Sequence, residues 1–148
     1  MRRFSLIVFL TFGFTTFLVG QKLKSSLVPK ELRDVFNQSF PKAKDISWKK
    51  KGDLYEVEFE EGLWNNDRTA WFNQQGEQLG LKEDIPKRKL PEKILNAISK
   101  NYKYFWILDV EKLSYKGTLT YEVDMKSFTK QWKVVFTPQG EEVSKVSD

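Results

Sequence analysis

The chain has 148 residues, of which 40% are apolar, 15% aromatic and 30% charged, a size that suits one compact domain or two small units sharing a core. The formal net charge is only +5, and lysines alternate with glutamates instead of forming one basic stripe, which argues against a nucleic-acid partner. Because the chain has no His and no Cys, Ser-His-Asp and Cys-His catalysis, His- or thiolate-ligated metal sites and disulfides are excluded.

Residues 1–20 have the layout of a secretory signal peptide. Arg2 and Arg3 precede an apolar run over 4–19, and Gly20 is a small residue just before Gln21. We therefore expect cleavage near Gly20 and a location in a bacterial periplasm or outside the cell. The run is slightly shorter than the roughly 20 residues of a membrane span. An uncleaved anchor is the alternative, and it would be the only membrane contact.

A first helix is predicted directly after Val28-Pro29, because proline fits the first turn of a helix. The apolar residues that follow recur at helical spacing and form one face: Leu32, Val35, Phe36 and Phe40. Pro41 ends the helix, since it disfavours the helical conformation of the preceding residue.

Four antiparallel strands are expected next, over 44–50, 53–62, 68–73 and 78–81. Ile46 and Trp48 alternate with polar residues, which assigns Trp48 to the core. In the second strand the apolar and acidic residues alternate with period two: Tyr55, Val57 and Phe59 against Glu56, Glu58 and Glu60. We expect the helix to cover the apolar side and to leave the acidic side open.

The same order begins again after residues 82–89, which are polar and predict a linker. The sequence leaves open whether this linker is a flexible joint or part of a continuous sheet. A shift of 62 residues places Leu32, Val35, Phe36 and Phe40 on Ile94, Ala97, Ile98 and Tyr102. The segment 121–125 repeats the alternation of the acidic strand, and 136–141 repeats the turn at 72–77. The sequence therefore predicts an α+β fold of two tandem repeats, 28–85 and 86–146, each a helix packed on a four-stranded antiparallel sheet.

These motifs together resemble the PepSY-like, beta-lactamase-inhibitor-like domains of exported bacterial proteins. The resemblance rests on Val28-Pro29 with its amphipathic helix, the segment 40–48 with Pro41, Ala43 and Trp48, the strand 55–59, and the turn before Gly76. The second half matches less closely, because 103–107 replaces the expected proline-containing segment. The resemblance implies export, no known catalysis and no cofactor, and related domains restrain or inhibit other proteins. It brings no binding residue with it.

The candidate binding residues come from the predicted open side of the sheet. Trp71 should point away from the core because Phe72 points into it, and Trp64 lies in a polar connection. With the acids they form the predicted partner site: Trp71, Trp64, Glu56, Glu58, Glu122 and Asp124. Large exposed aromatics anchor protein contacts. We therefore expect a non-catalytic module that binds or inhibits a periplasmic protein or peptide.

Other interpretations stay open at this point. Trp71 could pack on a neighbouring sheet, and the protein could be a structural accessory of the cell envelope with no specific ligand. The run 102–106 holds four aromatics in five positions, too many for one strand face. A hard cation could bind between carboxylates, here Glu58, Glu60, Glu122 and Asp124. Paired carboxylates could also serve a glycosidase, although this alternation is typical of any solvent-facing strand.

Overall fold

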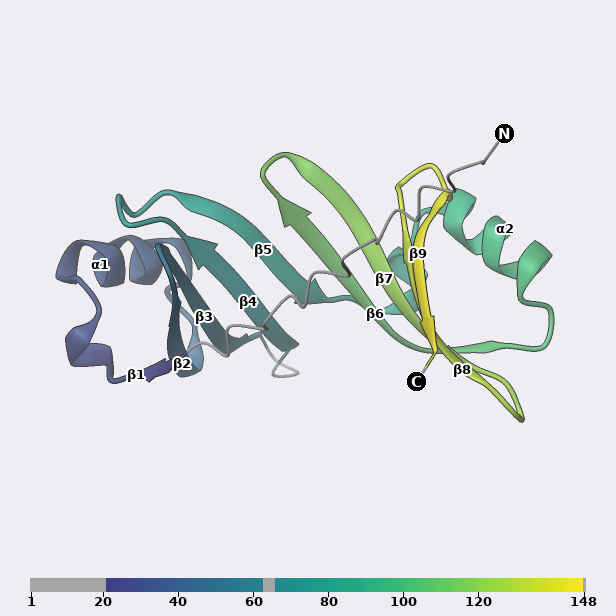
Figure 1. Cartoon of the computed structure of the whole chain (residues 1–148), viewed down its shortest axis with the longest axis horizontal. Helices are drawn as coiled ribbons and strands as arrows, with labels where there is room; N and C mark the ends of the chain where they lie inside the picture. Colours follow the sequence, from purple (N-terminus) through teal and green to yellow (C-terminus); the bar gives the residue numbers. More distant parts are fainter. Residues whose placement is uncertain (1–20, 63–65, 148) are drawn as a thin grey trace, which may run out of the picture.

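The computed structural model describes residues 21–62 and 66–147. Over these residues the protein is an α+β fold in which nine strands form one antiparallel sheet and two α-helices pack on it (Figure 1). The strand order in the sheet follows the chain order from β1 to β9. The predicted signal peptide at residues 1–20 and Trp64 lie outside the described residues. In the described part of the chain, no helix has the length and apolar character needed to cross a membrane.

Each α-helix is followed by four strands. The first half contains β1 (Gln21–Leu23), α1 (Lys30–Ser39), β2 (Lys44–Lys51), β3 (Leu54–Glu61), β4 (Asn66–Phe72) and β5 (Gln78–Asp84). The second half contains α2 (Glu92–Asn101), β6 (Trp106–Tyr115), β7 (Thr118–Lys126), β8 (Gln131–Phe136) and β9 (Glu142–Ser147). Short 3-10 helices, η1 (Ser25–Leu27) and η2 (Lys87–Lys89), precede the two α-helices.

Both α-helices begin directly after a proline and bury one narrow face. Pro29 precedes α1 and Pro91 precedes α2, each with an extended backbone. The buried side chains are four residues apart and so lie above one another on the helix: Leu32 and Phe36 in α1, Ile94 and Ile98 in α2. Val35, which the spacing predicts on the same face, lies at its margin and is 36% exposed.

The first hydrophobic core is built around aromatic rings. Phe36 lies at its centre, with ring centroids 5.1 Å from Phe59, 5.3 Å from Trp48 and 5.4 Å from Phe40. The rings meet edge-on or tilted, which is the favoured arrangement of aromatic pairs. Trp48 is 3% exposed, as its alternation predicts. Burying one such side chain contributes about 2–3 kcal/mol, so this cluster fixes α1 on β2, β3 and β4.

The second core is mainly aliphatic and lies under α2. Val110, Val123, Met125 and Val134 are buried there with Phe136. The strand register shows that both cores share one face of the sheet: Val57 pairs with Ala70, Ala70 with Leu81, and Leu81 with Ser114, which has the same parity as Val110. The two helices therefore cover the same sheet face near its opposite ends (Figure 1).

A chain of charged side chains separates the two cores on the helix face. Arg68 contacts Glu61 at 2.6 Å and Glu83 at 3.5 Å, and Lys112 contacts Glu83 at 3.5 Å. These four residues come from β3, β4, β5 and β6. The backbone of the sheet is thus continuous, while its apolar packing is divided into two parts.

The strands expected as two four-stranded sheets belong to one continuous sheet, an arrangement that the sequence left open. β5 pairs with β6 from Gly80–Tyr115 to Asp84–Glu111, and β1 adds a strand that was not predicted. Residues 82–84, predicted as part of a linker, instead end β5. Their polar side chains form cross-strand ion pairs, such as that between Lys82 and Glu111 at 2.7 Å, which stabilise a strand that hydrophobic alternation cannot reveal. The division of the chain into two repeats remains a prediction.

The predicted alternation also fails near the start of β2. The register shifts between Lys44 and Ser47, and Asp45 has a φ of 49°. Such an irregularity turns the strand locally. Ile46 is consequently 38% exposed, although Trp48 two residues later is buried.

Candidate binding face

The sheet face opposite the helices carries the candidate site. We call it the open face; its residues include Glu56, Trp71, Tyr115, Glu111 and Glu122. Strand pairing places Glu56 beside Trp71, Trp71 beside Gly80, and Gly80 beside Tyr115, in one row across β3 to β6. Trp71 thus points away from the core, as predicted from Phe72.

Trp71 and Tyr115 form an aromatic pair across Gly80. Their ring centroids are 5.9 Å apart and the rings are perpendicular. A Cβ atom on Gly80 would lie 2.5 Å from the Tyr115 ring and 3.2 Å from the Trp71 ring. The absent side chain therefore provides the space in which the two rings meet.

Glu56, a predicted binding residue, is 6% exposed and holds Trp71 in place. Its Oε2 accepts hydrogen bonds from Trp71 Nε1 at 2.9 Å and from Lys51 Nζ at 2.8 Å, and Lys49 Nζ lies 3.8 Å from Oε1. Burial raises the pKa of Glu56, but the hydrogen bonds from Lys51 and Trp71 outweigh it and leave the pKa below its ordinary value. Glu56 is an ionised support for Trp71.

Glu58 is more accessible than Glu56. Its side chain is 46% exposed and its Oε1 accepts a hydrogen bond from Lys49 Nζ at 2.5 Å. It faces Thr69 on β4 and Ser47 on β2. A partner could therefore reach the Glu58 carboxylate directly.

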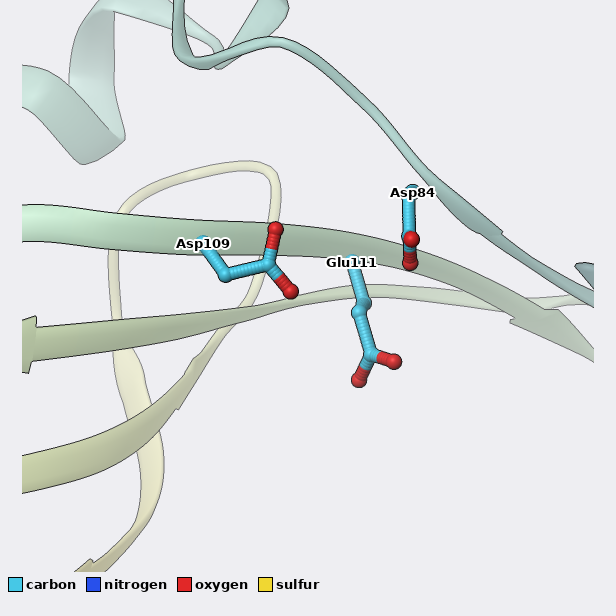
Figure 2. A group of neighbouring side chains, drawn as sticks. All are labelled: Asp84, Asp109 and Glu111. Atoms are coloured by element: carbon cyan, nitrogen blue, oxygen red, sulfur yellow. The ribbon is translucent and has the colours of Figure 1, made fainter. Parts of the chain in front are cut away.

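A carboxylate cluster lies where β5 meets β6, at the middle of the sheet. One oxygen from each of Asp84, Asp109 and Glu111 lies within 4.8 Å of the others (Figure 2). Burial, together with the charges of Asp109, Glu111 and Asp67, raises the pKa of Asp84 to about 6. The cluster thus concentrates negative charge that its own lysine, Lys82, only partly balances.

Glu111 behaves differently because it has a basic neighbour. Burial raises its pKa, but the hydrogen bond from Lys82 Nζ at 2.7 Å and the positive charges of Lys82 and Lys133 together outweigh burial, so the pKa lies below its ordinary value. Glu111 is ionised, and its charge adds to burial and to the charge of Asp109 in raising the pKa of Asp84.

The other two predicted acids, Glu122 and Asp124, adjoin this cluster from β7. Glu122 pairs with Lys133 at 3.0 Å, and Asp124 accepts hydrogen bonds from Gln131 Nε2 at 3.2 Å. They line a small hollow of about 60 Å³ with Asp109 and Glu111. Glu58 and Glu60 lie on β3, and β4, β5 and β6 separate them from Glu122 and Asp124, so the cation set suggested by the sequence is not brought together.

A larger hollow spans the middle of the sheet, with a volume of about 400 Å³. It is lined by residues of β3, β4, β5 and β6: Glu58, Phe59, Asp67, Arg68, Thr69, Lys82, Asp84, Asp109 and Glu111. Six of the nine residues are charged side chains of the open face, namely five acids and Lys82. The hollow thus offers a polar, predominantly acidic surface of side-chain size.

The model of the family described as putative beta-lactamase-inhibitor-like, PepSY-like matches residues 18–64 and 53–142 of the chain. The chain belongs to this PepSY-like family. The match includes both helices and eight of the nine strands in full, since only β9 begins at its last residue. This match confirms the resemblance inferred from the sequence motifs. No curated protein matches the chain significantly.

Solved structures share the fold of this PepSY-like chain. A putative periplasmic protein from Bacteroides eggerthii has a TM-score of 0.70 at 17% identity, with 81% of this chain and 88% of that chain covered. A DUF2874 family protein from Bacteroides uniformis has a TM-score of 0.67 at 18% identity, covering 80% and 88%. A BLIP-like protein from Bacteroides fragilis has a TM-score of 0.63 at 20% identity, covering 80% and 85%. At these identities the likeness concerns the fold.

Several residues of the PepSY-like open face were missed in the sequence. Tyr115, Asp84, Asp109 and Glu111 were not singled out, because β5 was predicted to end at residue 81 and the segment after it to be a linker. The acidic Glu111 next to the apolar Val110 was the alternation from which β6 and its open face could have been predicted. No sequence pattern pointed to the role of Gly80, because a glycine has no side chain whose polarity could predict the sheet face or the cross-strand neighbours of its position.

Proposed function

We propose that this protein is an exported, non-catalytic module that binds a segment of a periplasmic protein or peptide on the open face. The observation that carries the proposal is the combination of the Trp71–Tyr115 pair with the acidic hollow beside it, on a sheet face that neither α1 nor α2 covers. An aromatic anchor next to charged groups is the usual composition of a protein-binding surface. The beta-lactamase-inhibitor-like description of the family agrees with this role.

The charge of the hollow defines the chemistry of the partner. Asp84, Asp109 and Glu111 repel one another when all three are ionised, and burial together with this repulsion raises the pKa of Asp84 to about 6. A lysine or arginine side chain placed among them would remove the repulsion and gain charge-assisted hydrogen bonds. We infer that the bound segment presents a basic side chain to the hollow and an apolar one to Trp71.

Location is the second part of the proposal. Residues 1–20 are its export signal, cut near Gly20, and residues 28–85 and 86–146 are its two PepSY-like repeats. The basic start and apolar run support export, as does the periplasmic name of the protein from Bacteroides eggerthii.

The test is selection of peptides on the purified protein from a random display library. Enriched peptides should contain Lys or Arg, and their affinity, measured by fluorescence polarisation, should fall as salt rises. Trp71→Ala should weaken binding at least tenfold, whereas Tyr104→Ala, an 82% exposed aromatic elsewhere on the surface, should not. Circular dichroism would show that both variants fold.

A structural accessory without a ligand predicts a different outcome. No peptide would then be enriched above background, or those enriched would bind Trp71→Ala and wild type equally. Either result would refute binding through this face.

A further inference from the structure

A second exposed surface lies at the end of the second half, where the segment between α2 and β6 meets the hairpin of β7 and β8 (Figure 1). Trp106 pairs with Lys126 across β6 and β7, and its ring lies edge-on to the Phe128 ring at a centroid distance of 5.6 Å. We call this surface the aromatic tip. It consists of three aromatic residues and four lysines: Tyr104, Trp106, Phe128, Lys100, Lys103, Lys126 and Lys130.

The aromatic rings of the tip are held out into solvent. Phe128 is 93% exposed, Tyr104 82% and Trp106 44%. The turn that carries Phe128 is well connected: Ser127 N donates to Lys130 O at 2.7 Å, and Ser127 Oγ accepts from Lys130 N at 3.1 Å. Ser127 itself is buried. The position of Phe128 is therefore set by the turn, although the core does not need the ring.

The charge around these rings has one sign. Residues 93–108 and 125–140 contain six lysines and neither Asp nor Glu, whereas the whole chain has 20 acids against 25 bases. The four lysines of the tip are exposed, and within the described ranges none forms an ion pair. Basic residues thus gather at the tip while carboxylates gather at the open face.

A hollow of about 410 Å³ lies against the tip and has an amphipathic lining. Lys87 and Lys103 line it together with Leu95, Phe105 and Trp106. Basic groups beside apolar surface suit a phosphate headgroup with the start of its hydrocarbon chains. A neutral or basic peptide could use only the apolar part and would leave the lysines without charged partners.

We propose that the aromatic tip docks on the surface of an anionic lipid bilayer. Tyr104 and Trp106 would lie in the headgroup region, where amphipathic aromatic rings are favoured. The apolar ring of Phe128 would enter the boundary between headgroups and acyl chains, and the lysines would face the lipid phosphates. The projection of Phe128 from a hairpin turn fits insertion into a soft surface. This adds a membrane contact to the one that the sequence suggests for residues 1–20.

The absence of cysteine from the chain allows a probe at a single chosen position. Phe128→Cys carries an environment-sensitive fluorophore at the tip, and Leu27→Cys carries it at another apolar position, 66% exposed and close in sequence to residues 1–20. The full chain is mixed with vesicles of phosphatidylcholine, with or without phosphatidylglycerol. The label at 128 should shift to the blue with the anionic vesicles and be quenched by a lipid-borne quencher.

Two results would overturn the proposal. In the first, the label at 27 responds as strongly as the label at 128, which means that residues 1–20 alone bring the chain to the vesicle. In the second, changing Lys126 and Lys130 to Gln leaves the response unchanged. Each lysine near an anionic surface contributes roughly a fivefold factor in affinity, so the double variant should bind about twenty-five-fold more weakly. Lys116→Gln, which changes an exposed lysine on another turn, should bind as wild type.

Discussion

Replacing Asp84 by Asn should stabilise the protein at neutral pH, because the folded state partly buries its carboxylate and places it beside Asp109 and Glu111. The pKa of Asp84 is about 6 in the folded protein, against an ordinary value of 3.8. At 1.36 kcal/mol per pH unit this difference corresponds to at most roughly 3 kcal/mol, which solvent screening on a partly exposed face reduces to about 1–2 kcal/mol. We therefore expect Asp84→Asn to raise the free energy of unfolding by that amount at pH 7.5.

The pH dependence distinguishes this effect from a change in packing. The folded protein binds a proton at Asp84 more tightly than the unfolded chain does, so the destabilisation is complete above pH 6 and is lost as the pH falls towards 3.8. Urea unfolding followed by circular dichroism between pH 4 and 8 measures this directly. Glu141→Gln, at an exposed position in the turn before β9, is the control and should change nothing.

A result in which Asp84→Asn is neutral or destabilising at pH 7.5 would refute the electrostatic account of the hollow. If the variant is more stable but no longer binds basic peptides, the cluster is a site whose charge is kept at a cost in stability.

Three further tests, with five variants, address the packing and the support of the open face. Gly76 and Gly140 have similar φ values of 83° and 86°, but only at Gly140 would an added Cβ meet the backbone of α2, at 2.6 Å. In urea unfolding, Gly76→Ala should cost about 1 kcal/mol, and Gly140→Ala should cost about 2 kcal/mol more than Gly76→Ala. Equal losses of stability would contradict the contact with α2. Phe36→Ala removes the central ring of the first core and should cost about 3–5 kcal/mol by thermal or urea unfolding; a loss below 1 kcal/mol would show that the core repacks. Glu56→Ala should cost about 2–3 kcal/mol because it removes the hydrogen-bond partner of Lys51 Nζ and of the Trp71 indole N–H. The exposed Glu58→Ala should cost less than about 1 kcal/mol. The Glu56 contribution should be lost as the pH falls from 4.5 through its lowered pKa.

Local patterns were sufficient for the helices and for the faces of the strands. The spacing of Leu32 and Phe36, and of Ile94 and Ile98, reports which helix side is buried, because helical periodicity depends only on neighbours in sequence. The alternation of Tyr55 and Val57 with Glu56 reports the faces of β3 in the same way. Trp71 was placed correctly on the open face by its position next to Phe72.

Pairing between the two halves could not be predicted in this way. Residues 82–84 lack apolar alternation, and their place in β5 depends on partners in β6 that lie 27 or more residues away. For the same reason Asp84 was not expected beside Asp109 and Glu111, and Glu56 was expected to be accessible when Lys51 and Trp71 enclose it.

The sequence by itself determined two helices, the strands that carry alternating side chains, and the side of the sheet on which the acids lie, since each depends on short-range geometry. Tertiary structure alone decided that these strands join in one sheet, that Trp71 meets Tyr115 over Gly80, and which carboxylates converge. The physical reason is that strand register is fixed by burial and cross-strand contacts over the whole sheet, and residues distant in the chain become neighbours only when that register is formed.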